Sequence, residues 1–182
     1  MPKTTLAGHP LHPQLVGFPI GLLPFGLVMD AMYAVTNDEA YARAAHYAMI
    51  GGTAGAIAAG TAGILDYLAI ESRTEEKRLG NTHGLLNMGV LLVTGIALSK
   101  RRRGIPRSKA SALLLGLLAN AGLIVSQWYG GHLVYEQGIR VKQKGELEGV
   151  REYKTGWDDK LAKGLDAVAK KMPRVGPQEK MG

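Results

Sequence analysis

Four long stretches of the chain carry almost no charged side chain, and short polar segments connect them. Asp, Glu, Lys and Arg are absent or nearly absent from residues 15–29, 44–65, 79–99 and 110–135. A helix that crosses the hydrocarbon core of a bilayer needs about 20 mostly apolar residues. Three stretches reach this length directly, and the first reaches it once Asp30 is tolerated near its end. None shows the polar face at helical period that a soluble bundle needs. The pattern therefore predicts four membrane-spanning helices.

The predicted fold is all-α, an up-and-down bundle of four transmembrane helices. After an entry segment at 1–13, the bundle covers 14–138, and a tail covers 139–182. Within the bundle, we expect helices at about 14–35, 40–70, 83–99 and 109–135. Two prolines predict a kink in the first helix. Small residues at the spacing Gly51/Gly55 and Ala59/Gly63 predict close helix contacts in the second.

The tail contains an amphipathic segment outside the membrane, at about 156–172. Its apolar side chains fall on one helical face: Trp157, Leu161, Leu165, Val168 and Met172. A helix of this kind lies on a membrane surface or docks on a partner. Packing against its own bundle is an equally good interpretation.

Charge places the chain relative to the membrane. The net charge is +7, and much of it lies in the segment 100–109 and in the tail. Basic residues beside membrane boundaries reflect topology and lipid head groups, so we do not expect nucleic acid as a partner. The positive-inside rule predicts that the loop 100–109 is cytoplasmic and that both termini lie outside. Cysteine is absent, which excludes disulfides, thiolate ligands and covalently attached c-type haem.

The candidate ligand side chains lie at the outer face of the predicted bundle. The helix order brings His9, His12, His83 and His132 to this face, and only His46 lies toward the other. Asp66 ends the second helix there, and Asn87 lies one turn deeper than His83. Polar groups at membrane depth are costly and usually mark a site. Imidazole is the usual axial ligand of haem b between helices.

His83 and His132 form the preferred axial pair, because they lie at similar depth on successive helices. Gly130 and Gly131 would let a macrocycle approach the backbone, with His12 or His9 as a substitute ligand or propionate partner. Asp66 and Asn87 would orient imidazoles. For each histidine taken alone, a structural or interfacial role is the simpler interpretation. Asp66 also fits a metal ligand or a charge partner of Arg73 or Arg78.

Several motifs resemble a bacterial membrane family, domain of unknown function 2231, over about residues 7–141. The matching segments are Gly8-His9-Pro10-Leu11-His12-Pro13, Phe18-Pro19-Ile20-Gly21, Gly63-Ile64-Leu65-Asp66-Tyr67, His83-Gly84-Leu85-Leu86-Asn87 and Gly130-Gly131-His132-Leu133-Val134-Tyr135. The resemblance implies a four-helix protein of the bacterial inner membrane. Some members are fused to Rieske-type or c-type cytochrome domains, which implies electron transport. This chain has no such domain, so a redox partner would be a separate protein.

Three functions follow as hypotheses. The first is a b-type cytochrome-like subunit that passes electrons between a protein partner and the quinone pool or another carrier. The second is a non-haem site for zinc, copper or iron at His83, His132 and His12, with His9 as a further ligand. The third is a structural or assembly subunit without a cofactor. An accessory or electron-transfer role fits better than a stand-alone enzyme, since no nucleophile elbow, phosphate loop or dinucleotide fingerprint is present.

Overall fold

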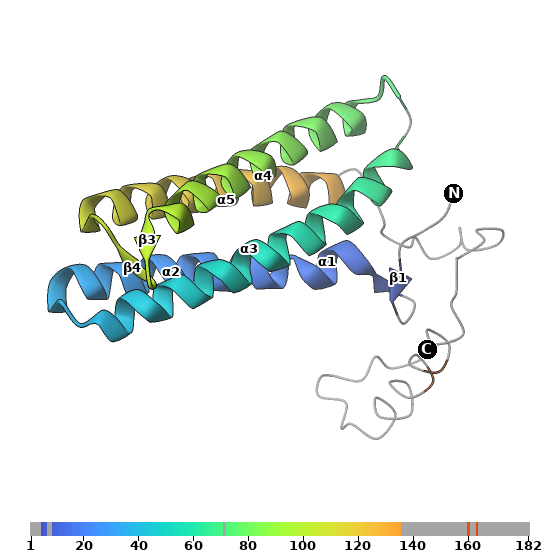
Figure 1. Ribbon diagram of the computed structural model, residues 1–182. Coiled ribbons are helices and arrows are strands. Elements are labelled where there is room, and N and C mark those ends of the chain that lie inside the picture. The colour runs from blue at the N-terminus through green and yellow to red at the C-terminus, as the bar shows by residue number, and fades with distance from the viewer. Residues whose placement is uncertain (1–4, 7–8, 71, 136–159, 161–162, 164–182) are drawn as a thin grey trace, which may run out of the picture.

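Long helices dominate the computed structural model, which describes residues 5–6, 9–70, 72–135, 160 and 163 (Figure 1). A short helix α1 leads into α2, and α3, α4 and α5 follow side by side with them. Two pairs of two-residue strands accompany the helices, although the sequence contains no convincing strand signal. The bounds are β1 Thr5–Leu6, β2 His9–Pro10, α1 Leu11–Leu15, α2 Gly17–Thr36, α3 Glu39–Leu68, α4 Glu75–Ser99, β3 Arg101–Arg102, β4 Ile105–Pro106 and α5 Lys109–Tyr135.

Four helical segments are long and apolar enough to cross a membrane, and they make the chain a multi-pass membrane protein. They are Leu11–Thr36, Glu39–Leu68, Glu75–Ser99 and Lys109–Tyr135. Large apolar side chains such as Leu92, Leu114 and Ile124 face outward, while the buried core consists largely of alanine. In water this distribution would expose a large apolar surface, whereas in lipid it is the expected one.

Close contact between α2 and α3 depends on glycine. A Cβ atom on Gly55 would lie 2.4 Å from Cβ of Phe18, and one on Gly52 would lie 2.8 Å from Cδ2 of Leu23. Ala59 is buried on the same helix. The small residues of α3 therefore let the two backbones approach, as their spacing predicts.

The helix bounds differ from the sequence prediction at two starts. The third spanning helix was expected from residue 83, but α4 begins at Glu75. Thr74 caps it by accepting a hydrogen bond from N of Lys77 at 3.2 Å. Two glutamates in the first turn interact favourably with the positive end of the helix dipole. The first span begins at residue 11 rather than 14, and Val16 separates α1 from α2. The predicted tail helix at 156–172 lies outside the described residues, apart from two isolated positions.

Strands β3 and β4 form a tight hairpin where the fourth span begins. Its two central residues, Arg103 and Gly104, have φ of 52° and 86°, as in the type I′ turn that suits a two-residue hairpin. Gly104 is buried against α3: a Cβ there would lie 3.3 Å from Cγ of Arg43 and 3.5 Å from Cδ2 of His46. The basic loop is thus a folded element packed on the bundle.

Candidate functional site

His12 is held by the backbone of a neighbouring helix. It lies in α1, and its Nδ1 is 2.7 Å from the carbonyl oxygen of Ala59 in α3. Because a carbonyl only accepts, Nδ1 carries the proton and Nε2 keeps a lone pair in the neutral ring. A Cβ on Gly63 would lie 3.0 Å from the same nitrogen. The absence of a side chain at Gly63 therefore makes room for the imidazole.

His83 is held in the same way by the backbone of α5. Its Nδ1 is 2.8 Å from the carbonyl oxygen of Ser126 in α5 and 3.1 Å from Oγ of that serine. The amide nitrogen of Asn87 lies 3.1 Å from Nε2 and donates to the His83 carbonyl at 3.0 Å. A Cβ on Gly130 would lie 3.0 Å from Cε1 of the ring. Nδ1 is again the protonated nitrogen, and Nε2 accepts.

The structure brings these two histidines together. The rings of His12 and His83 have centroids 6.2 Å apart and lie nearly perpendicular, at 89°. They come from α1 and α4, which are far apart in the sequence, and each is oriented from a further helix. Two half-buried imidazoles with the same tautomer thus meet at one end of the spanning segments.

His132 points elsewhere. Its ring stacks on Trp128, with centroids 5.6 Å apart and planes at 27°, and Trp128 is 64% exposed. His132 follows Gly130 by two residues, which is about 200° around a helix. Since Gly130 faces His83, His132 lies on nearly the opposite side of α5. The expected pairing of His83 with His132 is therefore replaced by one of His83 with His12.

The remaining expected residues surround this end of the bundle. His9 is exposed in β2, and its carbonyl accepts from Nε2 of Gln14 at 3.2 Å. Asp66 is half-buried in the last turn of α3. Asn87 lies one turn from His83, where the sequence places it. Gly131 faces Tyr135, whose ring atom Cδ2 would be 3.8 Å from an added Cβ.

Sequence reasoning missed the groups that orient the imidazoles. These are the carbonyls of Ala59 and Ser126, which bond to Nδ1 of His12 and of His83. Backbone carbonyls carry no sequence signal, but the spacing of Ser126 and Gly130 was available as a clue. The two residues are four apart, so they share the helix face that meets His83. Among the described residues, no group of three or more His, Cys, Asp or Glu side chains is placed to hold a metal ion.

The opposite end of the bundle contains a buried charged pair. The side chains of Asp30 in α2 and Arg101 in β3 are 2% and 1% exposed, and they form a salt bridge. Arg101 also donates to the carbonyl of Ala42 at 3.3 Å. His46 lies at this end, against the hairpin.

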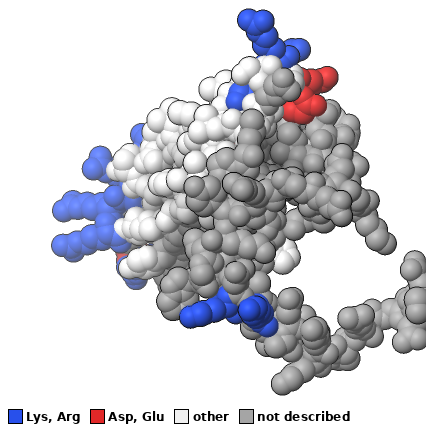
Figure 2. All heavy atoms as spheres, turned by 90° about the vertical axis from the view of Figure 1, so that its right-hand side faces the viewer, with Lys and Arg blue, Asp and Glu red and all other residues white. Residues whose placement is uncertain are grey.

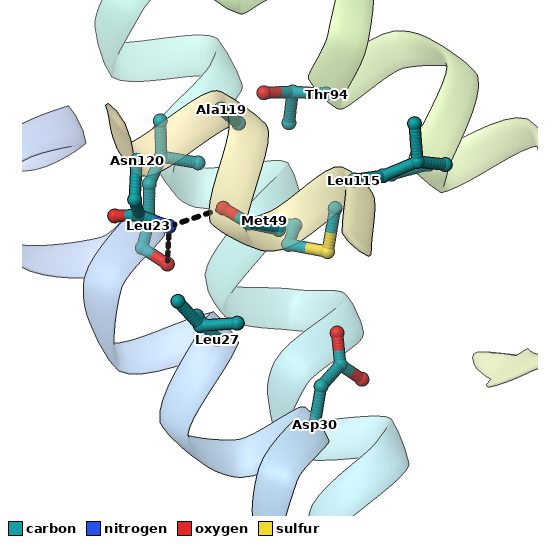
Figure 3. Close-up of a pocket in the computed structure, with 10 residues that line it drawn as sticks. Leu23, Leu27, Asp30, Met49, Thr94, Leu115, Ala119 and Asn120 are labelled. Atoms are coloured by element: carbon teal, nitrogen blue, oxygen red, sulfur yellow. Dashed lines mark hydrogen bonds between the residues drawn. The ribbon is translucent and has the colours of Figure 1, made fainter. Parts of the chain in front are cut away.

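A small cavity lies between this pair and the middle of the bundle (Figure 3). Asp30, Thr94 and Asn120 provide its polar lining, and apolar side chains such as Leu23 and Met49 provide the rest. Its volume is about 10 Å³, the lower limit for a single water molecule. Asn120 spans the helices by donating to Gly116 at 2.8 Å and to Leu23 at 3.4 Å.

Comparison with known families agrees with the fold. Residues 8–143 match the family described as predicted membrane protein (DUF2231), so the resemblance seen in the motifs is confirmed. No curated protein and no solved structure matches the chain. The matched range includes both histidines of the pair and the basic hairpin.

Proposed function

Since the chain belongs to the DUF2231 family of predicted membrane proteins, we propose that it is a membrane electron-transfer subunit that binds haem b between His12 and His83. One observation carries the proposal: the two imidazoles meet with Nδ1 bonded to a backbone carbonyl in each. A ligating histidine typically donates its other ring nitrogen to such an acceptor, which fixes its orientation and raises its basicity. Both rings are thus prepared to ligate through Nε2.

The number of ligands favours haem over a metal held by the protein alone. Haem needs only two axial imidazoles, because the macrocycle supplies the other donors. Zinc takes three or four protein ligands, and the described residues bring no third donor to this pair. In this proposal, the two imidazoles, whose ring centroids lie 6.2 Å apart, would be the protein ligands of one metal centre.

The surrounding residues fit the same role. Gly63 and Gly130 let the two rings pack directly against α3 and α5, and Asn87 would release Nε2 of His83 on ligation. Haem would supply one-electron chemistry between a separate redox protein and a second carrier, for which quinone is a candidate. In this proposal the protein orients the imidazoles, keeps water from the site and acts as a carrier rather than as an enzyme by itself.

A reduced-minus-oxidised spectrum of the purified protein tests the proposal. We expect a b-type spectrum with about one haem per chain. His12→Ala and His83→Ala should each abolish it. His132→Ala and His46→Ala are matched controls that remove an imidazole at the same or the opposite end, and both should retain it. A colourless protein after haem-replete expression, or loss of the spectrum only in His132→Ala, would contradict the His12–His83 site.

A cofactor-free structural subunit is the second candidate, and one observation favours it. Nε2 of His83 already accepts from Asn87, and both rings already bond to neighbouring helices. In this role the histidines join α1 to α3 and α4 to α5. The protein would then be colourless, and His83→Ala would lower its melting temperature without changing any spectrum.

We also propose that the loop 100–109 is cytoplasmic and that the histidine end faces outward in a bacterial inner membrane. Because the chain has no cysteine, single-cysteine variants report topology directly. Ser108→Cys should resist a membrane-impermeant maleimide in intact cells and react after lysis. Glu75→Cys should react in intact cells. The reverse pattern would invert the topology.

A further inference from the structure

The basic hairpin end contains more cations than the protein neutralises. Six cations lie within 100–109: Lys100, Arg101, Arg102, Arg103, Arg107 and Lys109. The structure provides partners for two of them. Arg101 pairs with Asp30. Lys109 bonds to Oδ1 of Asn37 and, at 3.2 Å, to the carbonyl of Ala34.

The other four are exposed and have no acidic partner among the described residues: Lys100, Arg102, Arg103 and Arg107. The nearby acidic side chains are already engaged. Glu39 pairs with Arg43 at 3.0 Å, and Asp38 accepts from N of Ala40 at 2.9 Å as the cap of α3. In Figure 2, Lys and Arg side chains form separate groups at the edges, with a broad uncharged described surface between them. The hairpin end therefore carries an uncompensated positive charge.

The fold holds in place the hairpin backbone that carries these cations. N of Arg107 donates to the carbonyl of Lys100 at 3.0 Å and closes the hairpin. The buried Arg101 anchors its first strand, and Gly104 packs on α3. Because the hairpin joins the ends of α4 and α5, its cations lie where the spanning segments end, at the depth of lipid head groups.

We propose that Lys100, Arg102, Arg103 and Arg107 form a binding surface for the phosphate groups of anionic phospholipids. Guanidinium groups bind phosphate through two parallel hydrogen bonds. A cluster of cations beside a spanning helix attracts anionic lipid strongly. The rigid hairpin reduces the conformational entropy lost on binding. This proposal is independent of any cofactor at the histidine pair.

Lipid titration of the detergent-purified protein, followed by native mass spectrometry, tests it. We expect phosphatidylglycerol to bind at least tenfold more tightly than phosphatidylcholine. Arg102→Gln/Arg103→Gln should lose about 25-fold in affinity for phosphatidylglycerol, because each cation contributes about fivefold. The matched control is Arg73→Gln/Arg78→Gln, which removes two exposed arginines at the other end. Each double variant also changes one arginine with a positive φ, which is 68° at Arg73 and 52° at Arg103.

Equal affinity for the two lipids would overturn the proposal, as would equal losses in both double variants. Circular dichroism shows whether each variant folds. If the hairpin variant does not fold, salt dependence of the wild-type protein decides the question. Binding of phosphatidylglycerol should then weaken as ionic strength rises, and salt-independent binding would contradict the proposal.

Discussion

The two ends of the bundle bury polar groups by opposite means. At the histidine end, Nδ1 of each imidazole bonds to a backbone carbonyl. At the hairpin end, a full ion pair is buried between α2 and β3. The bundle therefore buries polar side chains in two ways, by hydrogen bonds to the backbone at one end and by an ion pair at the other. The histidine end keeps the lone pairs of the two Nε2 atoms, while the charged hairpin end is a structural anchor.

The charged end is also less completely satisfied. Oδ1 of Asp30, Nε of Arg101 and Nδ1 of His46 are buried and have no hydrogen-bond partner among the described residues. A buried ion pair is costly unless its remaining donors and acceptors are bonded. At the histidine end, Nδ1 of both rings has a partner within 2.8 Å. The histidine pair is therefore the better candidate for a site that is ready to bind.

The largest effect is expected at the charged pair. Arg101→Met should destabilise the protein by about 3–5 kcal/mol, because it leaves the Asp30 carboxylate buried without its partner. The double variant Asp30→Leu/Arg101→Met should recover most of this loss. Thermal unfolding in detergent measures both. If the single and double variants melt alike, the pair is not the anchor of the hairpin.

A smaller effect is expected where α2 meets α3. Gly55→Ala should destabilise the fold by about 1–3 kcal/mol, because its Cβ would overlap that of Phe18. Gly60→Ala is the matched control on the same helix, since nothing lies within 4 Å of its added Cβ. The control should be neutral or slightly stabilising. Equal melting temperatures for the two variants would contradict the close approach.

Gly130→Ala tests the histidine end directly. The added Cβ would lie 3.0 Å from Cε1 of His83, so the ring must move by a few tenths of an ångström. We expect a loss of about 1 kcal/mol in stability and, under the haem proposal, lower haem content or a shifted spectrum. Gly131→Ala has only ordinary contacts, at 3.8 Å, and should change neither. A normal spectrum in Gly130→Ala would place the cofactor elsewhere.

The smallest effect is expected for Asn87. Asn87→Ala removes one hydrogen bond to Nε2 of His83, worth about 0.5–1.5 kcal/mol. If Nε2 ligates haem, the variant should bind haem at least as well as the wild type, because no amide competes for the lone pair. If the histidines serve only structure, the variant should simply melt earlier. Haem content and melting temperature, measured together, distinguish haem ligation from a purely structural role of the histidines.

The sequence by itself determined the spans and the end of the bundle at which most of the histidines lie. Hydropathy suffices for the spans, since the backbone in lipid must bond within each helix and needs a fixed length of apolar residues. The order of four helices then assigns His46 to one end and the other histidines to the opposite end. The sequence motifs also identified the family, which the match over residues 8–143 confirms.

Only the tertiary structure decided which groups meet. The depth of a residue in the membrane follows from its position along the helix. The direction in which its side chain points depends on the rotation of the helix about its axis, and two residues shift that direction by about 200°. That rotation turns His132 toward Trp128 and leaves Gly130 against His83. The pairing of His12 with His83 and of Asp30 with Arg101 arises from contacts between distant segments. Such contacts depend on how the whole bundle packs, and no local pattern encodes them.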